Sequence, residues 1–251
     1  MIKLLRCEFQ KSRRRFIALS AIGIIMVQVM WLFYALKGSQ NVNGWLMLLY
    51  QLPIMNTIFL PLVAIVISSR ICDLEHKGGM FKKLGTMMDR AVLFDCKLLY
   101  GVVVLESCIL FQWLTIIGIG SWKGFGHFPI KLYLLYLMFT SAAVIVIYIL
   151  HHCLSILFKN QTISFLVGIT GGFIGLFSLF FKQTVIQRIL LWSYFGIFQL
   201  VGLFGWDKEM RMANAHFETL PIDWFSFGIL LGMGTIIYWV GRKLFCKEEL
   251  C

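Results

Sequence analysis

The chain has 251 residues, of which 59% are hydrophobic and only 14% are charged, and its formal net charge is +11. A soluble domain of this length needs more charged residues to cover its core, so the composition indicates an integral membrane protein. The positive charge does not indicate a nucleic-acid-binding protein, because the basic residues gather at the ends of long apolar runs.

The chain begins with the basic stretch MIKLLRCEFQKSRRR, which is followed by an apolar run over 16–36. Ile2, Leu5 and Phe9 share one helical face, which predicts an amphipathic helix on the inner leaflet. The same charges also suit a simple topology determinant, and both interpretations stay open. The apolar run has 21 residues and no small-residue cleavage pattern follows it, so we expect a membrane anchor rather than a signal peptide.

Six apolar runs are long enough to cross a bilayer, which takes about 20 residues. The run at 189–206 is shorter and contains three glycines, so it is interpreted as a re-entrant or interfacial helix on the outer face. Six spans place both termini on one side together with sixteen of the 23 basic residues, which predicts cytoplasmic termini. The expected fold is an all-α polytopic membrane protein with a single transmembrane domain over 1–251. Its spans lie at about 16–36, 46–68, 92–117, 132–157, 162–181 and 223–241.

A charged stretch, RICDLEHKGGMFKKLG, interrupts the apolar sequence at 70–85 between the second and third spans. From Gly79 onward, Met80, Phe81, Leu84 and Met87 or Met88 recur on one side of a helix. The pattern predicts a short helix on the cytoplasmic side, after a bend at Gly78 and Gly79. Its apolar stripe gives a partner protein a surface to bind.

Glu106 lies near the centre of the third span, where a carboxylate is costly unless it is paired, protonated or facing water. It is either an intramembrane polar site with attraction for a cationic ligand, or a structural residue bonded to a neighbour such as Gln112 or Gln28.

Other motifs are absent. The sequence has no phosphate-binding loop and no hydrolase or metalloprotease motif, and His151 and His152 are adjacent and so diverge on a helix. No metal site is expected, and the seven cysteines are expected to be free thiols.

The run SSRICDLEHKGGMFKKLG, followed by Lys97 at the next span, resembles the cytoplasmic loop of ABC-2 type exporter permeases. It is most similar to the permease subunits of lantibiotic-immunity ABC transporters, which share the EHKG and Lys-Leu pattern and a similar length. Those permeases often carry a proline where this chain has Thr86, Met87 and Met88. The resemblance implies a coupling segment that touches an ATPase. Its residues are Glu75, Gly78, Phe81, Lys82 and Leu84.

The resemblance also implies partners and a location. The chain would pair with two ABC ATPase subunits and a second permease, identical or related, in a bacterial plasma membrane with its lipids. It would bind no cofactor and no nucleic acid, since ATP and Mg belong to the ATPase. The implied cargo is a lantibiotic or a similar cationic antimicrobial peptide, exported for self-protection. Outer-face aromatic residues could contact it or simply anchor the chain at the interface; they are Trp192, Tyr194, Phe195 and Trp206. A permease for another peptide or a lipid-like cargo and a non-transporting scaffold are the alternatives.

Overall fold

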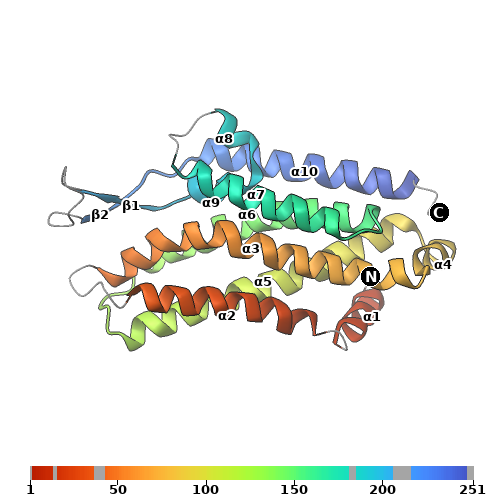
Figure 1. The fold of residues 1–251 in the computed structure, drawn as a ribbon, viewed down its shortest axis with the longest axis horizontal. Helices are drawn as coiled ribbons and strands as arrows, with labels where there is room; N and C mark the ends of the chain where they lie inside the picture. The colour runs from red at the N-terminus through yellow and green to blue at the C-terminus, as the bar shows by residue number, and fades with distance from the viewer. Residues whose placement is uncertain (1, 14–15, 37–42, 181–184, 206–215, 248–251) are drawn as a thin grey trace.

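The computed structural model describes residues 2–13, 16–36, 43–180, 185–205 and 216–247. Helices dominate, and their axes run roughly along one direction (Figure 1). In chain order the elements are α1 (Ile2–Arg13), α2 (Ile17–Ala35), α3 (Gly44–Lys77), α4 (Met80–Met87), α5 (Arg90–Trp122), α6 (Ile130–Leu157), α7 (Thr162–Ser178), α8 (Val185–Ile189), η2 (Leu191–Ser193), α9 (Tyr194–Ile197), β1 (Val201–Phe204), β2 (His216–Thr219) and α10 (Trp224–Lys247).

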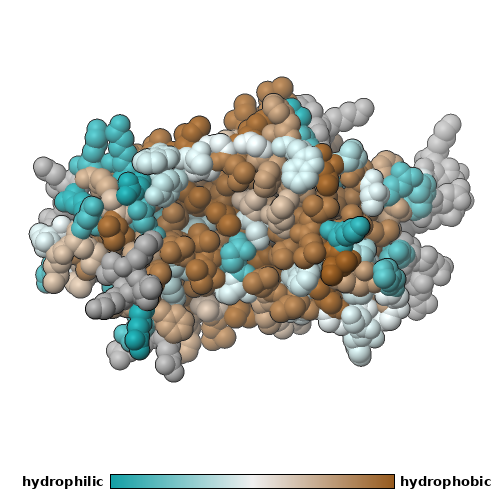
Figure 2. All heavy atoms as spheres, turned by 180° about the vertical axis from the view of Figure 1, so that it is seen from behind, coloured by the Kyte–Doolittle hydropathy of each residue, from teal (hydrophilic) through white to brown (hydrophobic). Residues whose placement is uncertain are grey.

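Five helices within the described ranges are long and apolar enough to cross a membrane, namely α2, α3, α5, α6 and α10. Helix α7 is apolar but has only 17 residues, and it lies along the others in the bundle (Figure 1). Figure 2 shows a broad hydrophobic band around the middle of the molecule, with hydrophilic residues toward both ends. The prediction of a helical polytopic membrane protein is confirmed, while the count of six spans stays a prediction.

Helix α3 is the centre of the bundle, since it packs against α2, α5, α6 and α7. Two thirds of its most apolar window is buried, against about a fifth for α10. Pro53 and Pro61 lie inside α3 without ending it. Each proline removes one backbone donor. Helix α3 nevertheless continues through the bundle and about two turns beyond the predicted span.

Glycines set the packing of α7, as its small-residue spacing indicates. A methyl group at Gly171 or Gly175 would collide with the Trp192 side chain, and Gly172 faces the backbone of α3. The glycines of α10 differ, because a methyl group at Gly228 or Gly232 would meet no other described part of the chain within contact distance. These two glycines therefore do not mark a close helix contact among the described residues.

The segment before the last span departs from the expected helix. Three short elements, α8, η2 and α9, are followed by strand β1, which pairs antiparallel with β2 in the register Val201 to Thr219 and Phe204 to His216. The interfacial helix expected over 189–206 is therefore only partly present, since Val201–Phe204 forms a strand. The reason is that β1 gains its hydrogen bonds from a segment beyond residue 215, a pairing that the pattern within 189–206 does not reveal.

The two ends of the bundle carry different elements (Figure 1). Helices α1 and α4 and the last turns of α10 lie at one end, and the β1–β2 hairpin lies at the other. This arrangement agrees with placing both tails on the same side of a membrane. We call the first the α4 end and the second the hairpin end.

Candidate functional site

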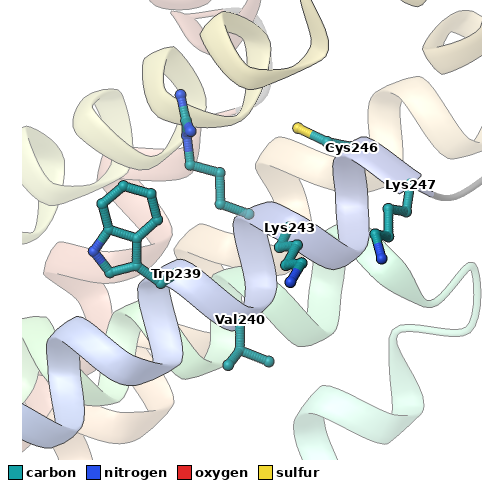
Figure 3. Close-up of a pocket in the computed structure, with 6 residues that line it drawn as sticks. Trp239, Val240, Lys243, Cys246 and Lys247 are labelled. Atoms are coloured by element: carbon teal, nitrogen blue, oxygen red, sulfur yellow. The ribbon is translucent and has the colours of Figure 1, made fainter.

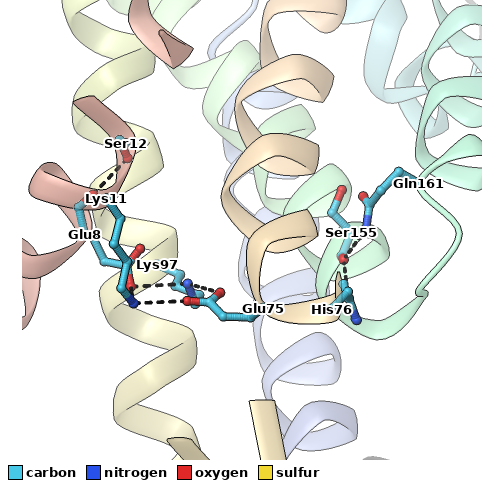
Figure 4. Close-up of polar contacts among 8 residues, drawn as sticks. All are labelled: Glu8, Lys11, Ser12, Glu75, His76, Lys97, Ser155 and Gln161. Carbon is cyan, nitrogen blue, oxygen red and sulfur yellow. Dashed lines mark hydrogen bonds and ion pairs between the residues drawn. The ribbon is translucent and has the colours of Figure 1, made fainter. Parts of the chain in front are cut away.

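A cluster of four charged residues, three of them buried, lies at the α4 end (Figure 4). Lys97 of α5 is fully buried, and its Nζ forms ion pairs with Glu75 Oε2 and, at 3.2 Å, with Glu8 Oε1. Lys11 Nζ lies 3.3 Å from Glu75 Oε1 and 3.4 Å from Glu8 Oε1. Two carboxylates and two ammonium groups make a neutral set, which is the condition for holding charges out of water. We call these four residues the inner ion cluster.

Three helices supply the inner ion cluster, so it joins parts of the chain that are far apart in sequence. Glu8 and Lys11 come from α1, Glu75 from the extension of α3 past the span, and Lys97 from the second turn of α5. On α1 the residues that face the bundle are Leu5, Glu8 and Ser12, at helical spacing, whereas Phe9 is exposed. A helix is therefore present over Ile2–Arg13, but it turns a carboxylate rather than Phe9 toward the bundle, and its place on the inner leaflet stays a prediction.

The charge of Lys11 depends on its two partners. Burial disfavours the charged form, but Glu8 and Glu75 outweigh that effect and raise the pKa of the ammonium group above its ordinary value. A raised lysine pKa contributes stability that is fully present below the unfolded pKa and is lost as the pH rises through the folded one. At neutral pH Lys11 is thus held in its charged form.

The predicted coupling residues fall into two groups in space. Glu75 and Phe81 are buried, the first in the inner ion cluster and the second against His76 and Phe245, with ring centroids 4.8 and 5.8 Å away. Neither side chain is available for direct contact with another protein in this structure. Leu84 packs beside Phe81 and is partly buried.

The bend before α4 is made by glycine, as the sequence predicts. Gly78 ends α3 with an ordinary φ of −89°, and Gly79 has a φ of +59°, which favours glycine. Lys82 lies in α4, but its side chain falls outside the described residues.

The apolar stripe of α4 packs mainly against other helices of the same chain. Phe81, Leu84 and Met88, spaced three and four residues apart, pack into a small cluster with Phe94 and Phe245. Two members of the predicted stripe, Met80 and Met87, lie on the outward face instead, so the prediction is wrong for these two residues. Met80 is 39% exposed and Met87 is 80% exposed, and Lys83 and Thr86 are exposed beside them. These four residues, which we call the outer face of α4, are the part of the segment that a partner can touch.

A second polar site lies inside the bundle, where four helices meet. Asn56 Oδ1 accepts hydrogen bonds from Gln28 Nε2 at 2.6 Å and from Gln112 Nε2 at 2.9 Å, and Asn56 Nδ2 donates to the Tyr136 hydroxyl. Gln112 Nε2 also donates to Gln28 Oε1 at 2.9 Å. All four side chains are buried. We call them the amide cluster.

Glu106 is not part of the amide cluster. Its Oε2 accepts a 2.9 Å hydrogen bond from the Ser141 hydroxyl on α6, and its Oε1 is buried with no partner among the described residues. The bonded neighbour is therefore Ser141 rather than Gln112 or Gln28. The arrangement leaves Glu106 as a candidate intramembrane polar site.

The outer aromatic residues are placed differently from the expectation. Tyr194 and Phe195 are buried among α3, α6 and α7, and the Tyr194 hydroxyl donates to the Arg188 carbonyl at 2.7 Å. Trp192 fits against the glycines of α7. Tyr194 and Phe195 therefore build the core and do not form an outer surface for a peptide, while Trp192 is only half-buried and its contact with a peptide stays a prediction. Trp206 lies outside the described residues.

Two members of the inner ion cluster, Glu8 and Lys11, are absent from the sequence prediction. The available signal was that Glu8 is the sole acidic residue among the first fifteen. An acidic residue on a basic membrane-surface helix opposes attraction to anionic lipid, so it needs another reason. Among the described residues, no group of three or more His, Cys, Asp or Glu could hold a metal ion, and the six cysteines are free.

Comparison with known proteins gives one match. A family model described as an ABC-2 family transporter protein matches residues 4–175, more than two thirds of the chain and all of α3, α4 and α5. No curated protein and no solved structure matches the chain.

Proposed function

This chain belongs to the ABC-2 family of transporter proteins, and from that premise we propose that it exports a cationic antimicrobial peptide. As a member of that family it is a membrane permease subunit of an ABC transporter, and it pairs with ABC ATPase subunits. The proposal adds three things to this assignment: the cargo, a second permease that completes the pathway, and the segment that couples ATP hydrolysis in the ATPase to movement of this chain.

The observation that carries the coupling proposal is the position of α4. It lies at the end of the bundle that gathers α1 and the end of α10, with its inner stripe packed and its outer face exposed. Because α4 is packed against the bundle on one face and exposed on the other, a partner that displaces α4 would also displace the residues packed against it. Behind it are Phe81, whose ring centroid lies 6.0 Å from Lys97 Nζ, and the inner ion cluster.

In this proposal the residues of the coupling segment have two different roles. The outer face of α4 contacts the ATPase, and Phe81, Leu84 and Glu75 transmit the displacement to α5 and α1. Gly78 and Gly79 allow the abrupt turn that places α4 across the end of α3. Lys82 stays in the proposed contact segment because it lies within α4.

Changing Met87, which is 80% exposed, should separate contact from folding. Met87→Glu is expected to leave the thermal unfolding temperature of the chain unchanged, because the side chain is already exposed. It should weaken co-purification with the ATPase about tenfold, the size expected when a charge enters an apolar contact. Met87→Leu is the matched control and should bind the ATPase normally. If Met87→Glu binds and protects as well as wild type, α4 is not the contact.

The cargo proposal stands on the resemblance over residues 68–97. Expressing this permease with its ATPase and second permease in a sensitive bacterium should raise tolerance of a cationic lantibiotic, but not of an uncharged antibiotic that acts inside the cell. A catalytically dead ATPase is the control and should abolish the protection. Unchanged lantibiotic tolerance, with the complex assembled and hydrolysing ATP, would contradict the cargo and leave the coupling intact.

A further inference from the structure

A groove on α10 near the α4 end is not used by the proposed function (Figure 3). Its volume is about 440 Å³, and it is bordered by side chains from the last three turns of the helix. Val240, Lys243 and Lys247 project from one side of α10, and Trp239 forms one end of the groove. The lining residues are Trp239, Val240, Arg242, Lys243, Cys246 and Lys247.

The basic residues of the groove differ in whether they are already paired. Arg242 is held by Asp95 of α5, with Nε 3.2 Å from Oδ1 and Nη2 3.2 Å from Oδ2, and the Tyr238 hydroxyl donates to the same carboxylate at 2.8 Å. Lys243 and Lys247 are exposed and have no partner among the described residues. Two lysines one helical turn apart therefore carry positive charge that no described residue neutralises.

The order of residues along the groove is apolar and then basic. Trp239 and Val240 are 63% and 52% exposed on the face where Ile236 and Leu244 are also exposed. From Trp239 to Lys247 the helix rises about 12 Å. Tryptophan is typical of the membrane interface, and unpaired lysines just beyond it reach the level of lipid head groups.

We propose that this groove binds an anionic phospholipid from the leaflet at the α4 end. Its phosphate lies between Lys243 and Lys247, and the first part of an acyl chain lies along Val240 and Trp239. The charge complementarity is direct, since two ammonium groups that pair with no residue in the described ranges meet one phosphodiester. The apolar side chains of Val240 and Trp239 make binding depend on the acyl chain of the lipid as well as on its head-group charge. Exposed lysines alone would recognise only the charge.

The test measures lipid retained by the purified full-length chain in detergent, by native mass spectrometry. Phosphatidylglycerol and phosphatidylcholine are titrated separately. Wild type should retain phosphatidylglycerol in preference, and Lys243→Gln with Lys247→Gln should weaken that retention about 30-fold, from two charges near a head group. Both lysines are exposed, so the variant should keep its unfolding temperature.

The matched control removes two exposed lysines at the same end, Lys77→Gln with Lys83→Gln, and should retain phosphatidylglycerol normally. Trp239→Ala should weaken retention with no change of charge. Equal losses in both double variants, no effect of Trp239→Ala, or displacement of the lipid by inorganic phosphate alone would each overturn the proposal. The proposal would also be overturned if Lys243→Gln with Lys247→Gln retained phosphatidylglycerol normally but no longer bound the ATPase or the second permease. The groove would then be a protein interface.

Discussion

Replacing Lys97 with methionine is expected to destabilise the chain by about 3–5 kcal/mol, the cost of removing one partner from a buried ion pair. Lys97 is fully buried and contacts both Glu75 and Glu8. Without it, Lys11 alone would face two carboxylates, and Lys11 is partly exposed. The variant should also lose protection, because α1, α3 and α5 would no longer be tied together at the α4 end.

The measurement is the free energy of unfolding, from titration of the purified chain with a denaturing detergent. Lys83→Met is the control, since it removes an exposed charge at the same end and should have an effect near zero. Lys97→Met combined with Glu75→Gln should recover part of the loss, because one uncompensated carboxylate is then removed. Equal stability of Lys97→Met and wild type would show that the inner ion cluster does not hold these helices together.

Replacing Asn56 with leucine is the second large effect, expected to cost about 2–3 kcal/mol. The change preserves volume but removes hydrogen bonds with Gln28, Gln112 and Tyr136, each of which then loses a buried partner. Individual hydrogen bonds between membrane helices average about 0.6 kcal/mol, and an orphaned buried group costs about 1–3 kcal/mol.

A double-mutant cycle with Gln112→Leu separates this network from simple packing. Because the two side chains share a hydrogen bond, the combined variant should be less destabilised than the sum of the single variants. The same unfolding titration gives the three values. Strict additivity of the two effects would mean that Asn56 and Gln112 act independently, which contradicts the amide cluster.

The long helices could be predicted from sequence, since each is marked locally by an apolar run and a charged boundary. Helix α4 could be predicted too, because Gly79 and the apolar stripe that begins at Met80 lie within ten residues. The stripe predicts that one face is covered but not what covers it. The cover is Phe245, far along the chain, so the face expected to meet a partner meets α10 instead.

The inner ion cluster could be predicted only in part. Glu75 and Lys97 stand out in the resemblance, but their pairing with Glu8 depends on how α1 lies against α5, which no local pattern determines. The β1–β2 hairpin was not predicted, for a similar reason. Val201 and Leu203 are compatible with helix or strand, and the strand is decided by hydrogen bonding to a segment outside the apolar run.

The central claim is that the outer face of α4 receives the push of the ATPase, and crosslinking tests it most directly. With Cys7 and Cys246, the exposed native thiols of the described residues, changed to serine, Met87→Cys should form a crosslink to the ATPase subunit in membranes. Phe204→Cys, exposed at the hairpin end, should form none. The account predicts that the Met87→Cys crosslink blocks ATP-dependent protection. No crosslink at Met87→Cys, or one equally strong at Phe204→Cys, would contradict it.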